Sequence, residues 1–316
     1  MKKFLSLIIA ITFGYGFELG KLGNFEFKHL NKNVYIMHGP IMKPSIENRG
    51  FMNNPAFIES KKGLIVIDPG GNYNIGKEVL KEIEKINKKP VLAIFNTHKH
   101  GDHWFANIAF LKKYPKVKIY AHPQMIKEVK DKEAIKWYNI LKKLTHNLKG
   151  TKPFAFPNTP IKDNEIIEID GEKFKITHPK SAHTNSDIII HHINSNTIFL
   201  GDNVMKGRLG MFDSSSSILE NINLLEKIKK TTNATIYVPG HGISGKKDEV
   251  INPYLNYLKT LKKYAQKAYN EDKESYEVAK EMLNELKSYH KWDDFKVMAP
   301  KHLQKVYLEI EEKDMQ

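Results

Sequence analysis

Short apolar runs alternate with amphipathic segments along the first 250 residues. Apolar or alternating runs predict strands at 25–29, 34–37, 63–68, 91–95 and 117–121, and later at 165–169, 173–177, 187–193, 197–200 and 234–238. Helical periodicity predicts helices at about 75–86, from about residue 104, at 123–148 and at 217–229. Residues 151–160 hold three prolines and are expected to form a loop. From residue 63 to 121 strands and helices take turns, which indicates an α/β fold.

The pattern changes after Pro253. From there about sixty residues show only helical periodicity, with apolar stripes such as Tyr254, Leu258 and Leu261. We therefore expect residues 251–316 to form a helical extension packed on a main domain of residues 17–250.

The first sixteen residues have the composition of a secretory signal peptide. Three residues, Met1-Lys2-Lys3, precede an apolar run from Phe4 to Phe13 and the small-residue segment Gly14-Tyr15-Gly16. We expect cleavage after Gly16, a periplasmic or secreted protein, and no membrane insertion of the mature chain. An uncleaved anchor or a buried first strand is the alternative.

Composition narrows the chemistry that the chain can perform. The 316 residues contain no cysteine, which excludes disulfides, iron–sulfur clusters and a cysteine nucleophile, so any metal must bind to histidine and carboxylate. The net charge of +14 is compatible with a nucleic-acid or anionic partner. The surplus is mostly lysine spread along the chain, however, which is typical of solvated helix faces. We expect a small-molecule substrate and no nucleic-acid partner.

The segment Thr97-His98-Lys99-His100-Gly101-Asp102-His103 follows the predicted strand at 91–95 and carries the densest chemistry of the chain. Neutral imidazoles and carboxylates are ligands that zinc and similar cations select. Alternation along the chain places His98 and His100 on one side, with Asp102 and His103 directed elsewhere. One strand end can therefore supply two adjacent metal positions.

Three isolated residues further along stand beside predicted strand ends and near glycine or small residues. His183 lies in Ser-Ala-His-Thr, Asp202 ends Phe-Leu-Gly-Asp, and His241 lies in Pro-Gly-His-Gly. Strand ends of this kind are where catalytic ligands gather.

Taken together and in this order, these motifs resemble the metallo-β-lactamase-fold hydrolase superfamily over about residues 25–250. The resemblance implies an αββα sandwich, in which two mixed β-sheets lie face to face with helices outside. It also implies a ligand set for two metals, namely His98, His100 and His183 for one, Asp102, His103 and His241 for the other, and Asp202 as a bridge. Asp68 matches the first motif of the family, an aspartate that orients the metal-binding loop.

The activity implied by the resemblance is metal-assisted hydrolysis. Two zinc ions, or alternatively iron or manganese, share a hydroxide that attacks a carbonyl, and Asp102 is a candidate to guide its proton. An aspartate at 202 resembles the glyoxalase II-like thioesterases more than the classical β-lactamases. Residues 48–54, the signal segment and the helical tail are similar to exported SoxH-like proteins. We therefore expect a thioester or related acyl substrate.

Several alternatives remain open at this point. One is β-lactam hydrolysis, and another is a mono-iron oxidoreductase of the persulfide dioxygenase type. A tRNA-processing nuclease shares the ligand motifs but does not fit export, and a non-enzymatic metal-binding module is a further possibility.

A few other residues are candidates for substrate contacts. Lys206 and Arg208 follow Asp202 and are suited to an anionic substrate group, as is Arg49. Trp104 either packs in the core or forms a wall of the cleft. The helical tail is expected to pack on the domain, with a lid or a homodimer contact as alternatives.

Overall fold

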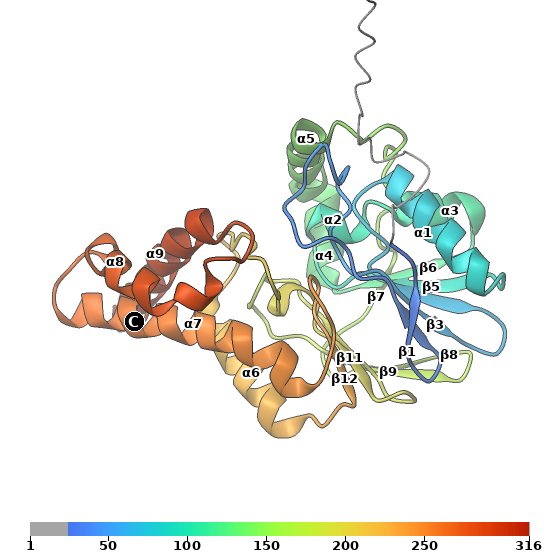
Figure 1. The fold of residues 1–316 in the computed structure, drawn as a ribbon. Coiled ribbons are helices and arrows are strands. Elements are labelled where there is room, and N and C mark those ends of the chain that lie inside the picture. Colours follow the sequence, from blue (N-terminus) through green and yellow to red (C-terminus); the bar gives the residue numbers. More distant parts are fainter. Residues whose placement is uncertain (1–24, 316) are drawn as a thin grey trace, which may run out of the picture.

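Two β-sheets lie face to face, with helices on their outer surfaces, in the computed structural model of the protein (Figure 1). The structure describes residues 25–315, so the signal peptide predicted at 1–16 lies outside the described residues. The arrangement confirms the expected αββα sandwich, and the C-terminal region is helical as predicted.

Within residues 25–315, the first sheet contains seven strands in chain order. They are β1 (Lys28–Asn31), β2 (Val34–Ile36), β3 (Ala56–Glu59), β4 (Leu64–Ile67), β5 (Val91–Phe95), β6 (Lys118–Ala121) and β7 (Thr159–Pro160). The strands pair antiparallel from β1 to β4 and parallel from β4 to β7. Helices α1 (Tyr73–Ile86), α2 (Gly101–Trp104) and α3 (Asn107–Lys113) belong to the crossovers between the parallel strands.

In the described part of the chain, the second sheet contains five strands in the order β12-β11-β10-β9-β8. These are β8 (Ile166–Ile169), β9 (Glu172–Thr177), β10 (Ile189–His192), β11 (Thr197–Phe199) and β12 (Ile236–Val238). Strands β11 and β12 pair parallel and are connected through α6 (Ile218–Thr231), whereas the other described pairs of this sheet are antiparallel.

The core between the sheets is built by the inward-facing half of each strand. Ile65 and Phe95 from the first sheet pack in one cluster with Phe174, Ile190 and Phe199 from the second. Separate apolar clusters lie under α1 and α3 on one outer face and under α6 and α7 on the other. Each sheet carries apolar side chains on both faces, so both faces must be covered. The other sheet covers one face and the helices cover the other.

Sequence patterning missed or merged three elements. Strand β3 was not predicted, although it is almost entirely buried, because the apolar run after Pro55 is only three residues long. The predicted helix at 123–148 is divided into α4 (Pro123–Glu128), a π-helical turn at Val129–Glu133, and α5 (Ala134–Thr145). The predicted loop at 151–160 ends in the short strand β7.

The helical extension consists of α7 (Lys247–Asn270), α8 (Ser275–Glu285), a 3₁₀ turn at Lys287–Tyr289, and α9 (Phe295–Asp314), drawn from orange to red in Figure 1. Helix α7 starts before Pro253, because the Glu249 carboxylate accepts a hydrogen bond from the Lys246 backbone N–H at 3.0 Å and fixes an earlier first turn. The expected boundary at 250/251 thus falls inside α7. None of the helices within residues 25–315 combines the length and apolar character needed to cross a bilayer.

The sheet topology brings four strand ends together. Parallel β4 and β5 end at one edge of the first sheet, and parallel β11 and β12 end at one edge of the second. Ligand candidates follow β5, β11 and β12, and Asp68 follows β4, so the fold collects these side chains at a common edge.

Candidate metal centre

Four short segments supply the metal-ligand candidates. The loop after β5 and the start of α2 carry His98, His100, Asp102 and His103, and a 3₁₀ turn at Gly201–Asn203 after β11 carries Asp202. His241 follows β12, and His183 lies in the turn that precedes β10. All seven side chains are buried, with at most 4% of any of them exposed.

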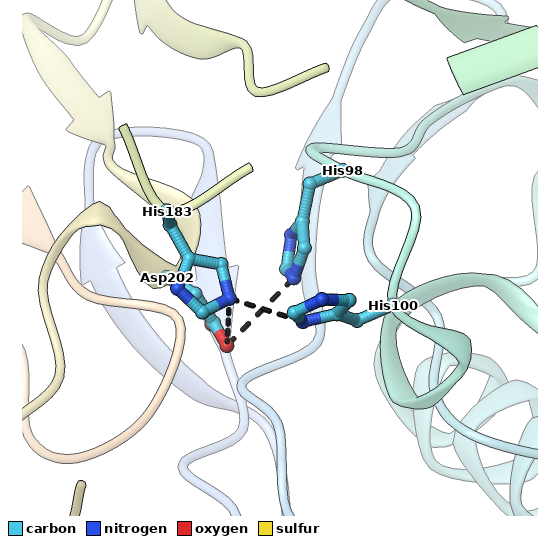
Figure 2. A group of neighbouring side chains, drawn as sticks. All are labelled: His98, His100, His183 and Asp202. Atoms are coloured by element: carbon cyan, nitrogen blue, oxygen red, sulfur yellow. Dashed lines mark hydrogen bonds and ion pairs between the residues drawn. The ribbon is translucent and has the colours of Figure 1, made fainter. Parts of the chain in front are cut away.

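The seven residues form two groups whose ligand atoms lie within 4.8 Å of one another. The first ligand group is His98, His100, His183 and Asp202, and the second ligand group is Asp102, His103 and His241. Figure 2 shows the imidazoles of His98 and His183 directed toward the carboxylate of Asp202, and the imidazole of His100 directed toward His183. His100 Nδ1 and His183 Nε2 are 3.0 Å apart.

Asp202 lies between the two groups. Its Oδ2 is 3.7 Å from His98 Nε2, 3.6 Å from His183 Nε2 and 3.2 Å from His241 Nε2, and its Oδ1 is 3.2 Å from His103 Nε2. Charge-assisted hydrogen bonds are shorter than this, at about 2.7–2.9 Å. Two ligands of one tetrahedral zinc ion, with bonds of about 2.0–2.1 Å, stand about 3.3 Å apart. The spacing is therefore that of ligands around a cation.

Buried atoms without hydrogen-bond partners support the same conclusion. Among the described residues, five of the seven ligand candidates keep such an atom at the centre, namely Nε2 of His98, His103 and His241, Oδ2 of Asp102 and Oδ1 of Asp202. The inward nitrogens of the other two, His100 Nδ1 and His183 Nε2, contact each other. Leaving so many buried polar atoms unpaired is costly unless a ligand satisfies them. The residues present therefore fit two adjacent metal ions.

The outer nitrogens of three histidines are held by fixed partners. His241 Nδ1 donates to the backbone carbonyl of Met52 at 2.7 Å, and His103 Nδ1 donates to the Asp68 carboxylate at 2.8 Å. The hydroxyl of Thr97 donates to Asp68 at 2.6 Å and lies 3.0 Å from His98 Nδ1, which makes it the acceptor of that ring's proton. Each contact directs the Nε2 of that ring into the centre.

Asp68 contacts the loop that carries the ligand candidates through several hydrogen bonds. It accepts from the Thr97 backbone N–H at 2.8 Å as well as from the side chains of Thr97 and His103. Its backbone has a φ of 47°, in the left-handed region that non-glycine residues seldom occupy. The side-chain amide of Asn53 donates to the Asp68 carbonyl at 2.7 Å and stabilises this conformation.

Asn54 holds the segment that carries His241. Its side-chain amide donates to the carbonyls of Pro239 at 2.9 Å and Gly242 at 2.7 Å, and its backbone N–H donates to the carbonyl of Gly240. Gly240 is required for steric reasons, because an added Cβ would lie 1.9 Å from Asp202 Oδ1. Asp202 and His241 can lie this close to each other only if residue 240 has no side chain.

The carboxylates and imidazoles of the centre shift one another's pKa values. Burial alone would raise the pKa of Asp202, but His241, His103 and His98 hold it well below its usual range. Burial would also raise the pKa of Asp102, but His103 and His241 hold that pKa well below its usual range. Burial opposes a charge on His103, yet Asp202 and Asp102 raise its pKa well above the usual value, whereas burial lowers the pKa of His98. A cation entering the centre would displace the proton held at His103.

The candidates for substrate contacts lie in different surroundings. Arg208 is buried, with Nη1 3.4 Å from His241 Nδ1 and with no hydrogen-bond partner for Nε in the part of the chain that is described. Lys206 is half-buried, and its backbone N–H donates to the His241 carbonyl. Arg49 is half-buried, and its backbone carbonyl accepts from Asn72 at 2.9 Å.

Trp104 belongs to the framework of the site. It is fully buried, and its indole N–H donates to the Lys99 carbonyl at 3.0 Å. Its ring packs on Phe105 and near Phe154 and Phe156. The core-packing alternative therefore describes Trp104, and not the cleft wall.

Sequence reasoning did not identify Met52, Asn54 or Lys99 as parts of the site. Met52 acts through its backbone carbonyl, which leaves no sequence signal. Two sequence features could have pointed to the other two residues. These are the pair Asn53-Asn54 ahead of a strand and the position of Lys99 between two candidate ligands.

Comparison with known proteins gives the same picture. Residues 48–241 match the family described as the metallo-beta-lactamase superfamily. The chain is 28% identical over 185 residues to a hydroxyacylglutathione hydrolase of Prochlorococcus marinus, a match that covers 58% of this chain and 62% of that protein. It is 23% identical over 234 residues to a type 2 metallo-beta-lactamase of Bacillus cereus, covering 71% and 78% respectively. The solved structure of the sec-alkylsulfatase Pisa1 from Pseudomonas sp. superposes with a TM-score of 0.68 at 15% identity, covering 90% of this chain and 50% of that one.

Proposed function

The chain belongs to the metallo-beta-lactamase superfamily of metal-dependent hydrolases, and from this premise we propose that it is an exported dinuclear zinc hydrolase of a thioester or related acyl substrate. The observation that carries the proposal is the pair of buried ligand groups meeting at Asp202.

The ligand set supports the reaction class. Two divalent cations bound there would supply a water of lowered pKa and an electrophile that polarises the bond under attack. The chain itself supplies Asp102, whose pKa is held well below its usual range by His103 and His241, so that its carboxylate stays ionised and is the candidate to guide the proton of that water. Burial of the ligand residues keeps bulk water away and strengthens these electrostatic interactions.

Two observations support an acyl thioester over a β-lactam. Asp202 stands at the position where the glyoxalase II-like pattern has an aspartate, and one relative is named as a hydroxyacylglutathione hydrolase. Because the chain spans less than two thirds of that relative, its substrate is transferred here only as part of the proposal.

Arg208 supports an anionic group on the substrate. Its guanidinium is buried beside His241, and within residues 25–315 no carboxylate forms an ion pair with it. A buried cation without a counter-ion is destabilising, and a carboxylate or similar anion of the substrate would relieve that cost.

Metal analysis of residues 17–316 is the first test. We expect about two zinc ions per chain, reduced in a His98→Ala variant. About one iron and little zinc would contradict the proposal and favour the persulfide dioxygenase alternative, which oxygen uptake with a persulfide would then test.

A substrate panel is the second test. The zinc-loaded protein is assayed with a hydroxyacyl glutathione thioester, an aryl ester, a chromogenic cephalosporin and a linear alkyl sulfate. We expect the thioester to give the highest kcat/KM, and preference for the cephalosporin or the alkyl sulfate would overturn the substrate assignment. N-terminal sequencing of the exported protein tests cleavage after Gly16.

A further inference from the structure

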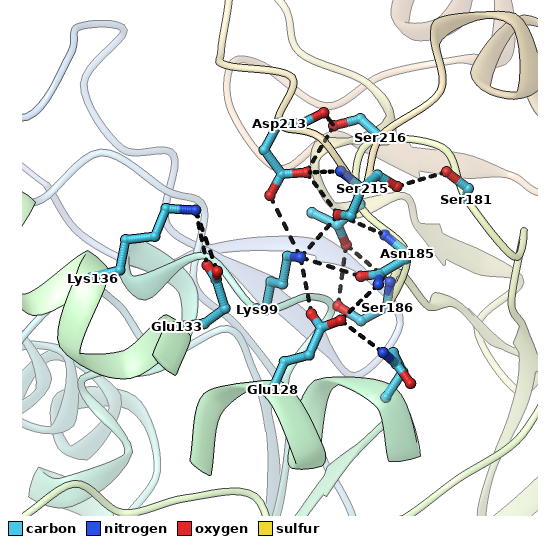
Figure 3. Close-up of polar contacts among 12 residues, drawn as sticks. Lys99, Glu128, Glu133, Lys136, Ser181, Asn185, Ser186, Asp213, Ser215 and Ser216 are labelled. Atoms are coloured by element: carbon cyan, nitrogen blue, oxygen red, sulfur yellow. Dashed lines mark hydrogen bonds and ion pairs between the residues drawn. The ribbon is translucent and has the colours of Figure 1, made fainter. Parts of the chain in front are cut away.

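Lys99 stands between two candidate metal ligands in the chain, and its ammonium lies in a separate cluster of polar side chains (Figure 3). Its ammonium donates to Glu128 Oε2 at 2.9 Å, to Ser215 Oγ at 2.9 Å and to Asn185 Oδ1 at 3.2 Å, and Asp213 Oδ2 lies 3.5 Å away. Only 4% of the side chain is exposed. We call these five residues the Lys99 network.

The partners of Lys99 come from separate segments of the chain. Glu128 ends α4, Asn185 follows His183 by two residues, and Asp213 and Ser215 lie in the loop before α6. Cross-links join these segments: the Asn185 amide donates to Glu128 Oε1 at 2.7 Å, and the Ser181 hydroxyl donates to the Ser215 carbonyl at 2.8 Å. The turn that carries His183 is therefore held on both sides by the network.

The second ligand group is held by different residues. His103 is fixed by Asp68, and His241 by Met52 and the segment bound to Asn54. Hydrogen bonds and ion pairs recorded for residues 25–315 do not connect these supports to the Lys99 ammonium. The two groups share Asp202 but are supported separately.

We propose that Lys99 is a positioning residue that fixes the His183 turn against the His98–His100 segment, and thereby sets the metal affinity of the first ligand group and not of the second. The inference rests on the proposed dinuclear centre. Without the ammonium, the carboxylates of Glu128 and Asp213 would lose their common cation inside the protein and repel each other. The segments they belong to would separate, and His183 would move from His98 and His100.

The experiment measures zinc binding, without substrate, by competition with a chromophoric chelator. In a His241→Ala background, which weakens the second group, Lys99→Met should lower zinc affinity by about 10- to 100-fold, as loss of outer-shell support does in other metal sites. In a His100→Ala background, which weakens the first group, the same change should leave zinc affinity within about threefold. Equal losses in both backgrounds, or no loss in either, would overturn the proposal.

Matched variants separate positioning from general damage. Lys136→Met also removes a lysine from an ion pair, with Glu133, but 46% of the Lys136 side chain is exposed, so zinc affinity should not change. Lys99→Arg keeps the cation and should restore most of the affinity lost in Lys99→Met. If Lys99→Met does not fold, Glu128→Gln, which removes one acceptor and keeps the cation, should give a smaller loss confined to the first group.

Failure of the proposed function has a different signature. If the wild-type chain binds fewer than two zinc ions, the dinuclear centre itself is wrong. If it binds two and Lys99→Met binds both with wild-type affinity, only the role of Lys99 is wrong.

Discussion

Two clusters of buried ionisable groups include residues of the segment His98–His100, and they differ in one respect. In the Lys99 network the ammonium has three hydrogen-bond acceptors and two carboxylates nearby. In the metal centre five of the seven ligand candidates keep a buried atom at the centre with no partner among the described residues. The satisfied cluster stabilises the fold, and the unsatisfied cluster marks the place of a ligand that the chain alone does not provide.

The largest effect is expected from Asp202→Ala, which tests whether the unsatisfied cluster is one centre. Asp202 lies within 4 Å of four histidines from both ligand groups, so its loss should weaken both metal positions. We expect kcat/KM to fall by at least about 10³-fold, since metal ions contribute several kcal/mol to such transition states. Zinc content and kcat/KM are the measurements, and a variant that retains two zinc ions and near-native activity would contradict the shared role of Asp202.

Removing the metals should lower the stability of the folded chain, because the buried ligand atoms then have no partner. A ligand present at 100 to 1,000 times its dissociation constant adds about 3–4 kcal/mol of stability. For two zinc ions this predicts that a strong chelator lowers Tm by roughly 10 °C or more, measured by calorimetry.

The control for the chelator experiment is the Asp202→Ala variant. The Asp202→Ala variant should respond much less to chelator, because it has less metal to lose. A wild-type Tm that is unchanged by chelation would mean that the buried orphan atoms are tolerated without a cation.

The contrast between the two clusters also explains what the sequence could predict. The ligand residues were identified because histidine and aspartate at strand ends have few structural uses, and His98, His100 and His103 stand within six positions of one another. Lys99 was overlooked because it is one of 50 basic residues, most of which belong to solvated surfaces. Its burial depends on Glu128 and Asp213, which lie far away in the chain.

The same limit applies to the fold. Local periodicity predicted most strands and helices, and the order of these elements agreed with a sandwich. It did not predict β3, which is too short and apolar for a period to be recognised, or the start of α7, where Glu249 overrides the expectation at Pro253. The support of His241 by the Met52 carbonyl could not be predicted, because a backbone group has no sequence signal.

Arg208→Gln tests a charged group that is only partly satisfied. If its guanidinium binds an anionic group of the substrate, KM should rise by about 10- to 100-fold, the range expected for hydrogen bonds to charged groups, with kcat changed by less than about threefold. Lys206→Gln is the control, since Lys206 is more exposed and should change KM by less than about threefold. A fall in kcat with KM unchanged would place Arg208 in support of His241 instead.

The smallest effect is expected from His302, a buried histidine of α9 that is satisfied like the Lys99 network. Its Nε2 donates to the Gly210 carbonyl at 2.8 Å, and its Nδ1 accepts from the Tyr257 hydroxyl at 2.8 Å. Burial lowers the pKa of His302 to about 4. Between pH 6.5 and 4 the unfolded chain therefore binds a proton here that the folded chain does not, and this site makes the folded state less stable as pH falls.

Comparing His302→Gln with the wild-type chain isolates that contribution. The variant lacks the titration, so its free energy of unfolding should fall less steeply between pH 6.5 and 4.5, by up to about 2–3 kcal/mol over the interval, as measured by urea unfolding. The ligand histidines titrate in both proteins, and their contribution cancels in the difference. If the free energies of unfolding of the two proteins depended on pH in the same way, the pKa of His302 would not be lowered by burial. The folded chain would then bind a proton at His302 as readily as the unfolded chain does.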